Sequence, residues 1–270
     1  MAKIIAVIGS PGSGKTTVTL KIAQELYCAT TSGAVIYLSP SLKIPALGVL
    51  FPNYTPDSIF SLGKMLDKTD IYEEDVLNHL VTVKAMKNFG CLGYKAGENR
   101  FSYPDLTDDK VKALFDVLHT MAGYVFVDCT EEENDLISQY ALGMADEVIM
   151  VISPDLKSMV YVSSNESNHT DRAIKVLNIN EHELYSPIDD IRTNVKNISF
   201  ILPYSKQIRG QHLDGLLYER AKDKKYRTEI SKIINRIMEE KGRNHNEKDF
   251  WYSYGHCRYC NCINSCSKCY

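Results

Sequence analysis

The sequence predicts an α/β fold in which helices cover both faces of a mostly parallel β-sheet. Short aliphatic runs rich in β-branched residues recur along the chain, and segments with helical periodicity separate them. The composition agrees, because 44% of the 270 residues are hydrophobic and 24% are charged, as in ordinary globular domains.

The predicted strands are short aliphatic runs. The first, residues 3–9 (KIIAVIG), is apolar on both faces, as is typical of a strand buried inside a parallel sheet. The others are residues 34–38, 124–127, 148–152 and 198–202. Because parallel neighbours need crossover connections, we expect helices between these strands.

Helical periodicity follows the first strand over residues 15–27, and it returns over 108–121, 134–144 and 155–165. A further helix over 225–240 is predicted by an apolar face that includes Tyr226, Ile230 and Ile233. Four prolines interrupt residues 40–56. We therefore expect loops, short helices (one near 57–66) and one weak strand between residues 41 and 100.

A phosphate-binding loop follows the first strand. Its residues match the pattern G-x-x-x-x-G-K-[ST] and are Gly9, Ser10, Pro11, Gly12, Ser13, Gly14, Lys15 and Thr16, with Thr17 next in the chain. Between a strand and a helix, the backbone N–H groups of such a loop and the helix dipole converge on one point that suits a polyphosphate. Lys15 is expected to reach the β- and γ-phosphate oxygens, and the Thr16 hydroxyl to ligate Mg²⁺.

Asp128 is the expected carboxylate on the metal side of this site. It ends the aliphatic run 124–127, and ligands of open α/β sheets bind at the carboxyl ends of strands. Lys15 and Asp128 are therefore the candidate catalytic residues, and Thr16 and Asp128 the candidate Mg²⁺ ligands. The acidic run 131–133 is expected to supply charge to the N-terminus of the next helix rather than a catalytic base.

Three segments together resemble the ParA/MinD superfamily of P-loop ATPases: the phosphate-binding loop, residues 128–130 (DCT) and residues 145–155 (ADEVIMVISPD). The resemblance covers about residues 1–240, and residues 153–158 (SPDLKS) bring it nearest to the CpaE/TadZ-like branch. It implies a P-loop NTPase fold, ATP and Mg²⁺ as cofactors, and protein partners, with a homodimer among the assemblies. It also implies a role as a localisation or assembly factor, including for a pilus or secretion system.

The chain departs from this superfamily at positions that bear on hydrolysis. Ser10 stands where typical members carry a lysine that contacts nucleotide across a dimer. Ser39 and Ser41 stand where aspartates organise Mg²⁺ and the attacking water, and residues 201–204 lack the asparagine often used for adenine recognition. We therefore expect an ATP-binding protein that is a weak ATPase at most.

A cysteine-rich tail, residues 244–270, is expected to follow a P-loop domain of residues 1–243. Five cysteines lie within residues 257–269, and C-x-x-C pairs are typical of tetrahedral Zn²⁺ sites. The candidate zinc ligands are Cys257, Cys260, Cys266 and Cys269. Because the spacing between the pairs fits no ordinary zinc finger, an iron–sulfur site, a redox-active thiol patch and an unstructured tail without metal stay open as alternatives.

Charge and hydropathy limit the expected location and partners. The net charge of −3 argues against a protein that coats nucleic acid, yet basic residues outnumber acidic ones within 206–249. A partition-type ATPase that binds nonspecific DNA is one alternative. A small-molecule kinase is another, although only Arg100 could serve an arginine-rich lid between Lys15 and Asp128. Because no apolar run reaches the length of a transmembrane segment and no signal peptide is seen, we expect a cytoplasmic protein, recruited to a membrane-associated or polar complex if the resemblance holds.

Overall fold

The structure is a computed structural model of the 270-residue chain, and it describes residues 1–30, 33–52, 60–83, 85–132, 134–165, 171–181 and 188–239. The chain divides into two compact units, Met1–Ile234 and Asn235–Tyr270. The first unit holds the sheet and the phosphate-binding loop. The predicted domain boundary at 243/244 and the cysteines of the tail lie outside the described residues.

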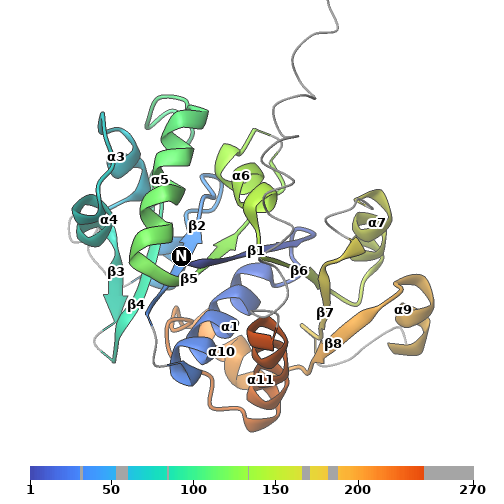
Figure 1. Cartoon of the computed structure of the whole chain (residues 1–270). Helices are drawn as coiled ribbons and strands as arrows, with labels where there is room; N and C mark the ends of the chain where they lie inside the picture. Colours follow the sequence, from blue (N-terminus) through green and yellow to red (C-terminus); the bar gives the residue numbers. More distant parts are fainter. Residues whose placement is uncertain are drawn as a thin grey trace, which may run out of the picture. The chain divides into compact units, whose positions relative to one another are not determined.

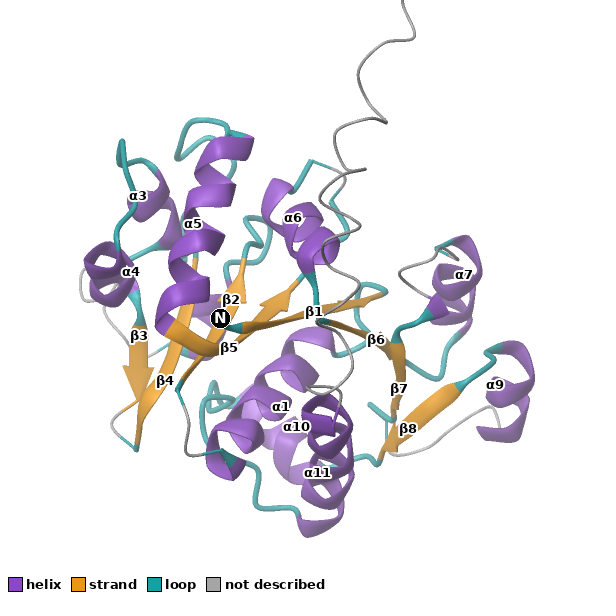
Figure 2. Cartoon of the chain, in the orientation of Figure 1, coloured by secondary structure: helices purple, strands orange, loops and turns teal. Residues whose placement is uncertain are grey.

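Eight strands form one sheet in the described part of the chain (Figures 1 and 2). They are β1 (Lys3–Gly9), β2 (Ala34–Ser39), β3 (Val81–Val83), β4 (Met86–Gly93), β5 (Ala122–Asp128), β6 (Glu147–Ile152), β7 (Ile174–Asn178) and β8 (Ile198–Leu202). Their order is β3-β4-β2-β5-β1-β6-β7-β8, and every neighbouring pair is parallel except the edge pair β3–β4. The predicted fold class, a mostly parallel sheet with helices, is therefore confirmed.

Helices cover both faces of this sheet (Figure 2). They are α1 (Lys15–Ala29), α2 (Ala46–Leu50), α3 (Leu62–Leu66), α4 (Glu73–His79), α5 (Asp108–Met121), α6 (Leu136–Met144), α7 (Leu156–Ser164), α9 (Ile188–Asn194), α10 (Lys206–Leu213) and α11 (Lys224–Glu239). The predicted long helices agree with α1, α5, α6, α7 and α11 to within two residues. Of the helix predicted near 57–66, Leu62–Leu66 is helical and 53–59 lie outside the described residues. None of the described helices is long and apolar enough to cross a membrane.

The central strand β1 is buried on both sides because its side chains alternate between two apolar layers. Ile4, Ala6 and Ile8 belong to one core cluster with residues such as Leu114 of α5 and Ile137 of α6. Helices α1 and α10 lie on the opposite side of the sheet (Figure 1). A strand enclosed in this way needs no polar face, which explains the uninterrupted apolar run in its sequence.

Residues 41–100 hold two strands, β3 and β4, where one weak strand is predicted, and β7 is not predicted at all; β4 and β7 each contain residues that usually weaken a strand. Lys175 lies in the middle of β7, yet it is only 9% exposed, and its Nζ reaches the backbone O of Lys196 at 3.3 Å. Gly90 and Gly93 lie in β4, where side chains would clash: a Cβ on Gly90 would lie 2.8 Å from Leu80 Cδ2. In both strands tertiary packing overrides local propensity.

Helix α1 is anchored to the segment between α10 and α11 by polar groups buried in its middle. Lys21, which is 1% exposed, donates hydrogen bonds to the carbonyl oxygens of Leu217 and Glu219. One turn further on, Glu25 accepts two hydrogen bonds of 2.7 Å from the Arg220 guanidinium. This anchor fixes the middle of α1, the helix that begins at the phosphate-binding loop.

Candidate nucleotide site

The loop after β1 has the backbone conformation that a phosphate cradle needs. Gly12 and Gly14 adopt φ values of +88° and +85°, which lie in the left-handed region that favours glycine. At Gly14 there is also no room for a side chain, because a Cβ would lie 2.4 Å from Nδ2 of Asn178. The same Nδ2 donates a 2.9 Å hydrogen bond to the carbonyl oxygen of Ser13, so the end of β7 braces the loop.

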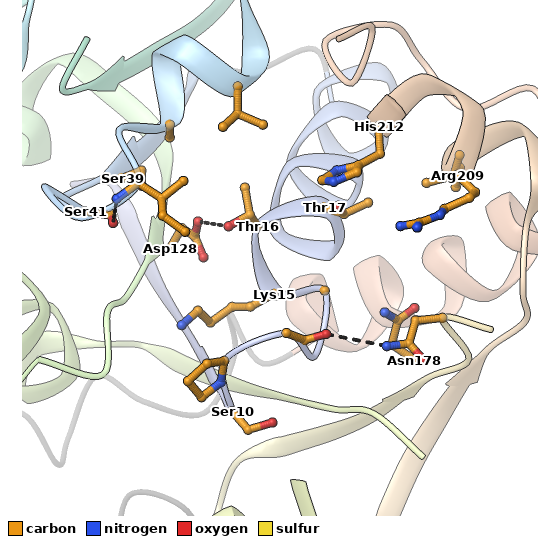
Figure 3. A pocket seen from close by; sticks show the side chains of 18 of the residues that line it. Ser10, Lys15, Thr16, Thr17, Ser39, Ser41, Asp128, Asn178, Arg209 and His212 are labelled. Carbon is orange, nitrogen blue, oxygen red and sulfur yellow. Dashed lines mark hydrogen bonds between the residues drawn. The ribbon is translucent and has the colours of Figure 1, made fainter. Parts of the chain in front are cut away.

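On the metal side, the carboxylate of Asp128 sits at the end of β5 beside the start of α1 (Figure 3). Its Oδ2 accepts hydrogen bonds from Thr16 Oγ1 at 2.6 Å and from the Tyr37 hydroxyl at 2.9 Å. Its Oδ1 is buried and has no hydrogen-bond partner among the described residues. Two hard oxygen donors, one of them unsatisfied, fit Mg²⁺.

Burial raises the pKa of Asp128 above the ordinary value, against the lowering effects of the Lys15 charge and the hydrogen bonds from Thr16 and Tyr37. The carboxylate is only 4% exposed, so its charge lacks water as well as a partner for Oδ1. The pKa of the Tyr37 hydroxyl is raised as well, first by its own burial and then by the adjacent negative charge. A bound cation would relieve this electrostatic cost.

Two ion pairs join the loop after β5 to the cations of the site. Glu131 Oε1 contacts Lys15 Nζ, and Glu132 Oε1 lies 3.3 Å from Lys43 Nζ. The expectation that the acidic run supplies charge to the next helix is wrong for these two residues, because α6 begins only at Leu136 and is capped by the Asp135 side chain. In the structure, the two glutamates instead pair with Lys15 and Lys43.

Ser10 lies in the loop but its hydroxyl is used elsewhere. It is 1% exposed, and its Oγ lies 2.5 Å from Oγ of Ser158 in the first turn of α7. The Ser158 hydroxyl also lies 2.8 Å from Ser153 Oγ, at the end of β6. Figure 3 shows the Ser10 side chain pointing away from Thr16 and Asp128, so its hydroxyl ties the loop to β6 and α7.

These side chains surround an open cavity of about 920 Å³, which is large enough for a nucleotide. Its walls include most of the predicted site residues: Ser10, Pro11, Gly12, Gly14, Lys15, Thr16, Thr17 and Asp128. Ser39, Ser41 and Lys43 also line it. Gly9 comes within the packed sheet, since a Cβ there would lie 2.3 Å from the carbonyl oxygen of Val151.

The cavity also contains residues that the sequence did not single out. They are Asn178, the last residue of β7, Asn180 just after it, Tyr204 after β8, and Arg209 and His212 on α10. Asn178 escaped notice because its strand was missed, although an asparagine at the end of an apolar run was a usable signal. Arg100, considered above for a lid, does not line the cavity and lies over the Phe101 ring at 4.7 Å.

Comparison with solved structures shows the fold of ParA and MinD ATPases. A ParA family ATPase from Chlorobium tepidum TLS superposes with a TM-score of 0.67 and 15% identity, over 87% of this chain and 98% of that one. MinD from Pyrococcus horikoshii OT3, complexed with Mg-ADP, gives a TM-score of 0.68 and 16% identity over 90% of this chain and 98% of that one. The ATP complex of a Cyanothece McdA variant gives a TM-score of 0.60 and 14% identity over 88% of this chain and 96% of that one. The CpaE/TadZ-like branch is not among these similarities.

Similarity in sequence is more local. No protein-family model matches the chain. Cytidylate kinase from Saccharolobus islandicus is 38% identical over 65 residues, which make up 24% of this chain and 34% of the kinase. The chain therefore aligns with about a third of the length of the curated relatives it matches, and the agreement in fold with ParA and MinD extends much further.

Proposed function

We propose that this protein binds MgATP and acts as a nucleotide-responsive ATPase of the ParA/MinD kind, whose nucleotide state controls its assembly with protein partners. One observation carries the proposal: Thr16 and Asp128 meet beside Lys15, with a buried carboxylate oxygen still unpartnered among the described residues. In a fold shared with MinD bound to Mg-ADP, this arrangement supports a phosphate and magnesium site.

The chain's own residues divide the work of binding. The amides of the loop and Lys15 would hold the phosphates, while Thr16 and Asp128 would hold Mg²⁺, which supplies charge neutralisation for the phosphates. The amides of Asn178 and Asn180, whose Nδ2 groups donate to the loop carbonyls of Ser13 and Gly12, line the cavity together with Tyr204. Their amide oxygens and the aromatic ring of Tyr204 are groups that can bind a nucleobase.

Hydrolysis is expected to be slow. Position 10 is a serine whose hydroxyl is hydrogen-bonded to Ser158. It therefore supplies no positive charge to a nucleotide bound by a second copy of the chain. Ser39 and Ser41 line the cavity with hydroxyls, which are poor bases near neutral pH. Lys43 lines the cavity as well, where it is paired with Glu132, and is a candidate cation within the chain.

Calorimetric titration with MgATP tests the proposal. Lys15→Ala should abolish binding, because an unneutralised phosphate charge costs on the order of 2–5 kcal/mol. Lys43→Ala is the matched control: this lysine also lines the cavity but is 77% exposed, so its loss should change affinity far less. Undiminished affinity in Lys15→Ala would refute the assignment.

For the cellular role, we propose localisation or assembly of a pilus or secretion complex by homodimers or partner complexes that form with ATP. The support is the resemblance of residues 153–158, together with the fold. A fluorescent fusion should form discrete foci that Lys15→Ala disperses. Foci that persist in the variant would contradict nucleotide control.

Two other functions have specific observations behind them. A DNA-partition ATPase is favoured by the basic excess in residues 206–249, and salt-sensitive binding to nonspecific DNA would support it. A small-molecule kinase is favoured by the 65-residue similarity to cytidylate kinase, and conversion of CMP with MgATP to CDP and ADP would support it. The basic segment and the similarity to cytidylate kinase each cover a smaller part of the chain than the fold shared with ParA and MinD.

Zinc binding by the tail stays a proposal. Cys257, Cys260, Cys266 and Cys269 lie outside the described residues, and the described part of the chain holds no group of three or more His, Cys, Asp or Glu side chains placed to bind a metal. Metal analysis of protein purified without chelator should find about one Zn²⁺ per chain. Stoichiometric iron, or no metal, would favour the alternatives.

A further inference from the structure

We infer that Glu131 is the carboxylate that orients and deprotonates the attacking water when ATP is hydrolysed. This inference rests on the proposed function. It answers a chemical need of the site, because the hydroxyls of Ser39 and Ser41 cannot accept a proton usefully near neutral pH. The carboxylate must therefore come from another part of the cavity wall.

Four carboxylates line the cavity among the described residues: Asp128, Glu131, Glu132 and Glu181. Asp128 is buried, and its carboxylate accepts hydrogen bonds from Thr16 and Tyr37 at the proposed Mg²⁺ site. Glu132 is engaged with the exposed Lys43, and Glu181, a described residue three positions after the end of β7, forms no ion pair with Lys15. Glu131 alone contacts the lysine that is expected to bind the β- and γ-phosphates.

The contact between Glu131 and Lys15 fixes how near this carboxylate lies to the terminal phosphate. Two oxygens that each accept a hydrogen bond from one ammonium nitrogen lie about 5 Å apart, which is room for one water bonded to both. Glu131 is 32% exposed, so water reaches it. It has no role in capping α6, since Asp135 does that.

The same contact makes the base dependent on the nucleotide. Without nucleotide, Lys15 is paired with Glu131; when phosphates also bind Lys15, the ammonium is shared between them and Glu131, and the carboxylate can then accept a hydrogen bond from the water. As the water oxygen bonds to the γ-phosphorus, the bond from phosphorus to the β–γ bridging oxygen breaks and its electron pair leaves with ADP. The water proton passes to Glu131 and then to the phosphate product, which restores the carboxylate.

Single-turnover hydrolysis tests the inference, with full-length protein in excess over γ-³²P-ATP and Mg²⁺. Glu131→Gln keeps the size of the side chain and removes the base, so phosphate release should slow by at least about 100-fold. MgATP affinity, measured separately by calorimetry, should stay the same or rise, because a competitor for Lys15 is gone. Glu132→Gln is the matched control, and its rate should stay within about fivefold of wild type since its ion pair is exposed.

Three results would overturn the role of Glu131: a wild-type rate in Glu131→Gln, an equal loss in both variants, or wild-type phosphate release no faster than that of Lys15→Ala. Failure of the proposed function has a different signature, since the wild-type protein would then not bind MgATP in the calorimeter at all. A fall in rate with intact affinity, confined to Glu131→Gln, would support the inference.

Discussion

Replacing Asp128 with asparagine should stabilise the nucleotide-free protein and remove most of the stabilisation that MgATP gives. The amide oxygen of asparagine can accept the same hydrogen bonds from Thr16 and Tyr37, at 2.6 and 2.9 Å, and the buried negative charge disappears, while the amide nitrogen takes the place of Oδ1. We expect a gain of about 1 kcal/mol. In a chain of this size that raises Tm by about 2–4 °C.

With MgATP at about 100 times its Kd, the wild type should gain about 2.7 kcal/mol. Loss of the metal-side carboxylate should weaken MgATP about 10–100-fold and reduce that gain to between about 0.4 and 1.4 kcal/mol. The order of melting temperatures should therefore reverse, which thermal unfolding with and without MgATP measures. If Asp128→Asn melts below wild type without nucleotide, or gains as much from MgATP, the reasoning on the buried carboxylate is refuted.

Three further predictions concern α1 and the loop that precedes it. Burial lowers the pKa of Lys21 from 10.5 to about 7, so between these pH values the unfolded state binds more protons than the folded state. The free energy of unfolding of the wild type, measured in denaturant relative to Lys21→Met, should therefore rise by up to about 5 kcal/mol from pH 7 to 10.5, and a difference that does not change with pH would contradict this. Gly14→Ala should weaken MgATP binding in calorimetry at least tenfold, since its Cβ would displace the Asn178 amide and strain a φ of +85°. Ser10→Ala should lower the free energy of unfolding by about 1 kcal/mol through the lost hydrogen bond to Ser158. MgATP affinity should fall by less than about tenfold, because Asn178 still braces the loop, and a larger loss would show that the hydroxyl serves the nucleotide.

The phosphate side of the site could be predicted from sequence because its chemistry is local. The loop, Lys15 and Thr16 are consecutive, and Asp128 ends an unmistakable apolar run. Glu131 and Asn178 could not be assigned in this way. Their positions depend on where α6 begins and on a strand with a central lysine, and long-range packing decides both.

The bond from the Asn178 amide to the Ser13 carbonyl, and that between the Ser10 and Ser158 hydroxyls, hold the phosphate loop from two sides. Fixing the backbone of a free loop costs about 1–2 kcal/mol per residue in conformational entropy. In this protein the loop becomes ordered when the chain folds, so ligand binding does not have to supply that free energy. Affinity for the phosphates should therefore depend little on the rest of the ligand, and inorganic pyrophosphate should compete with ATP for the loop.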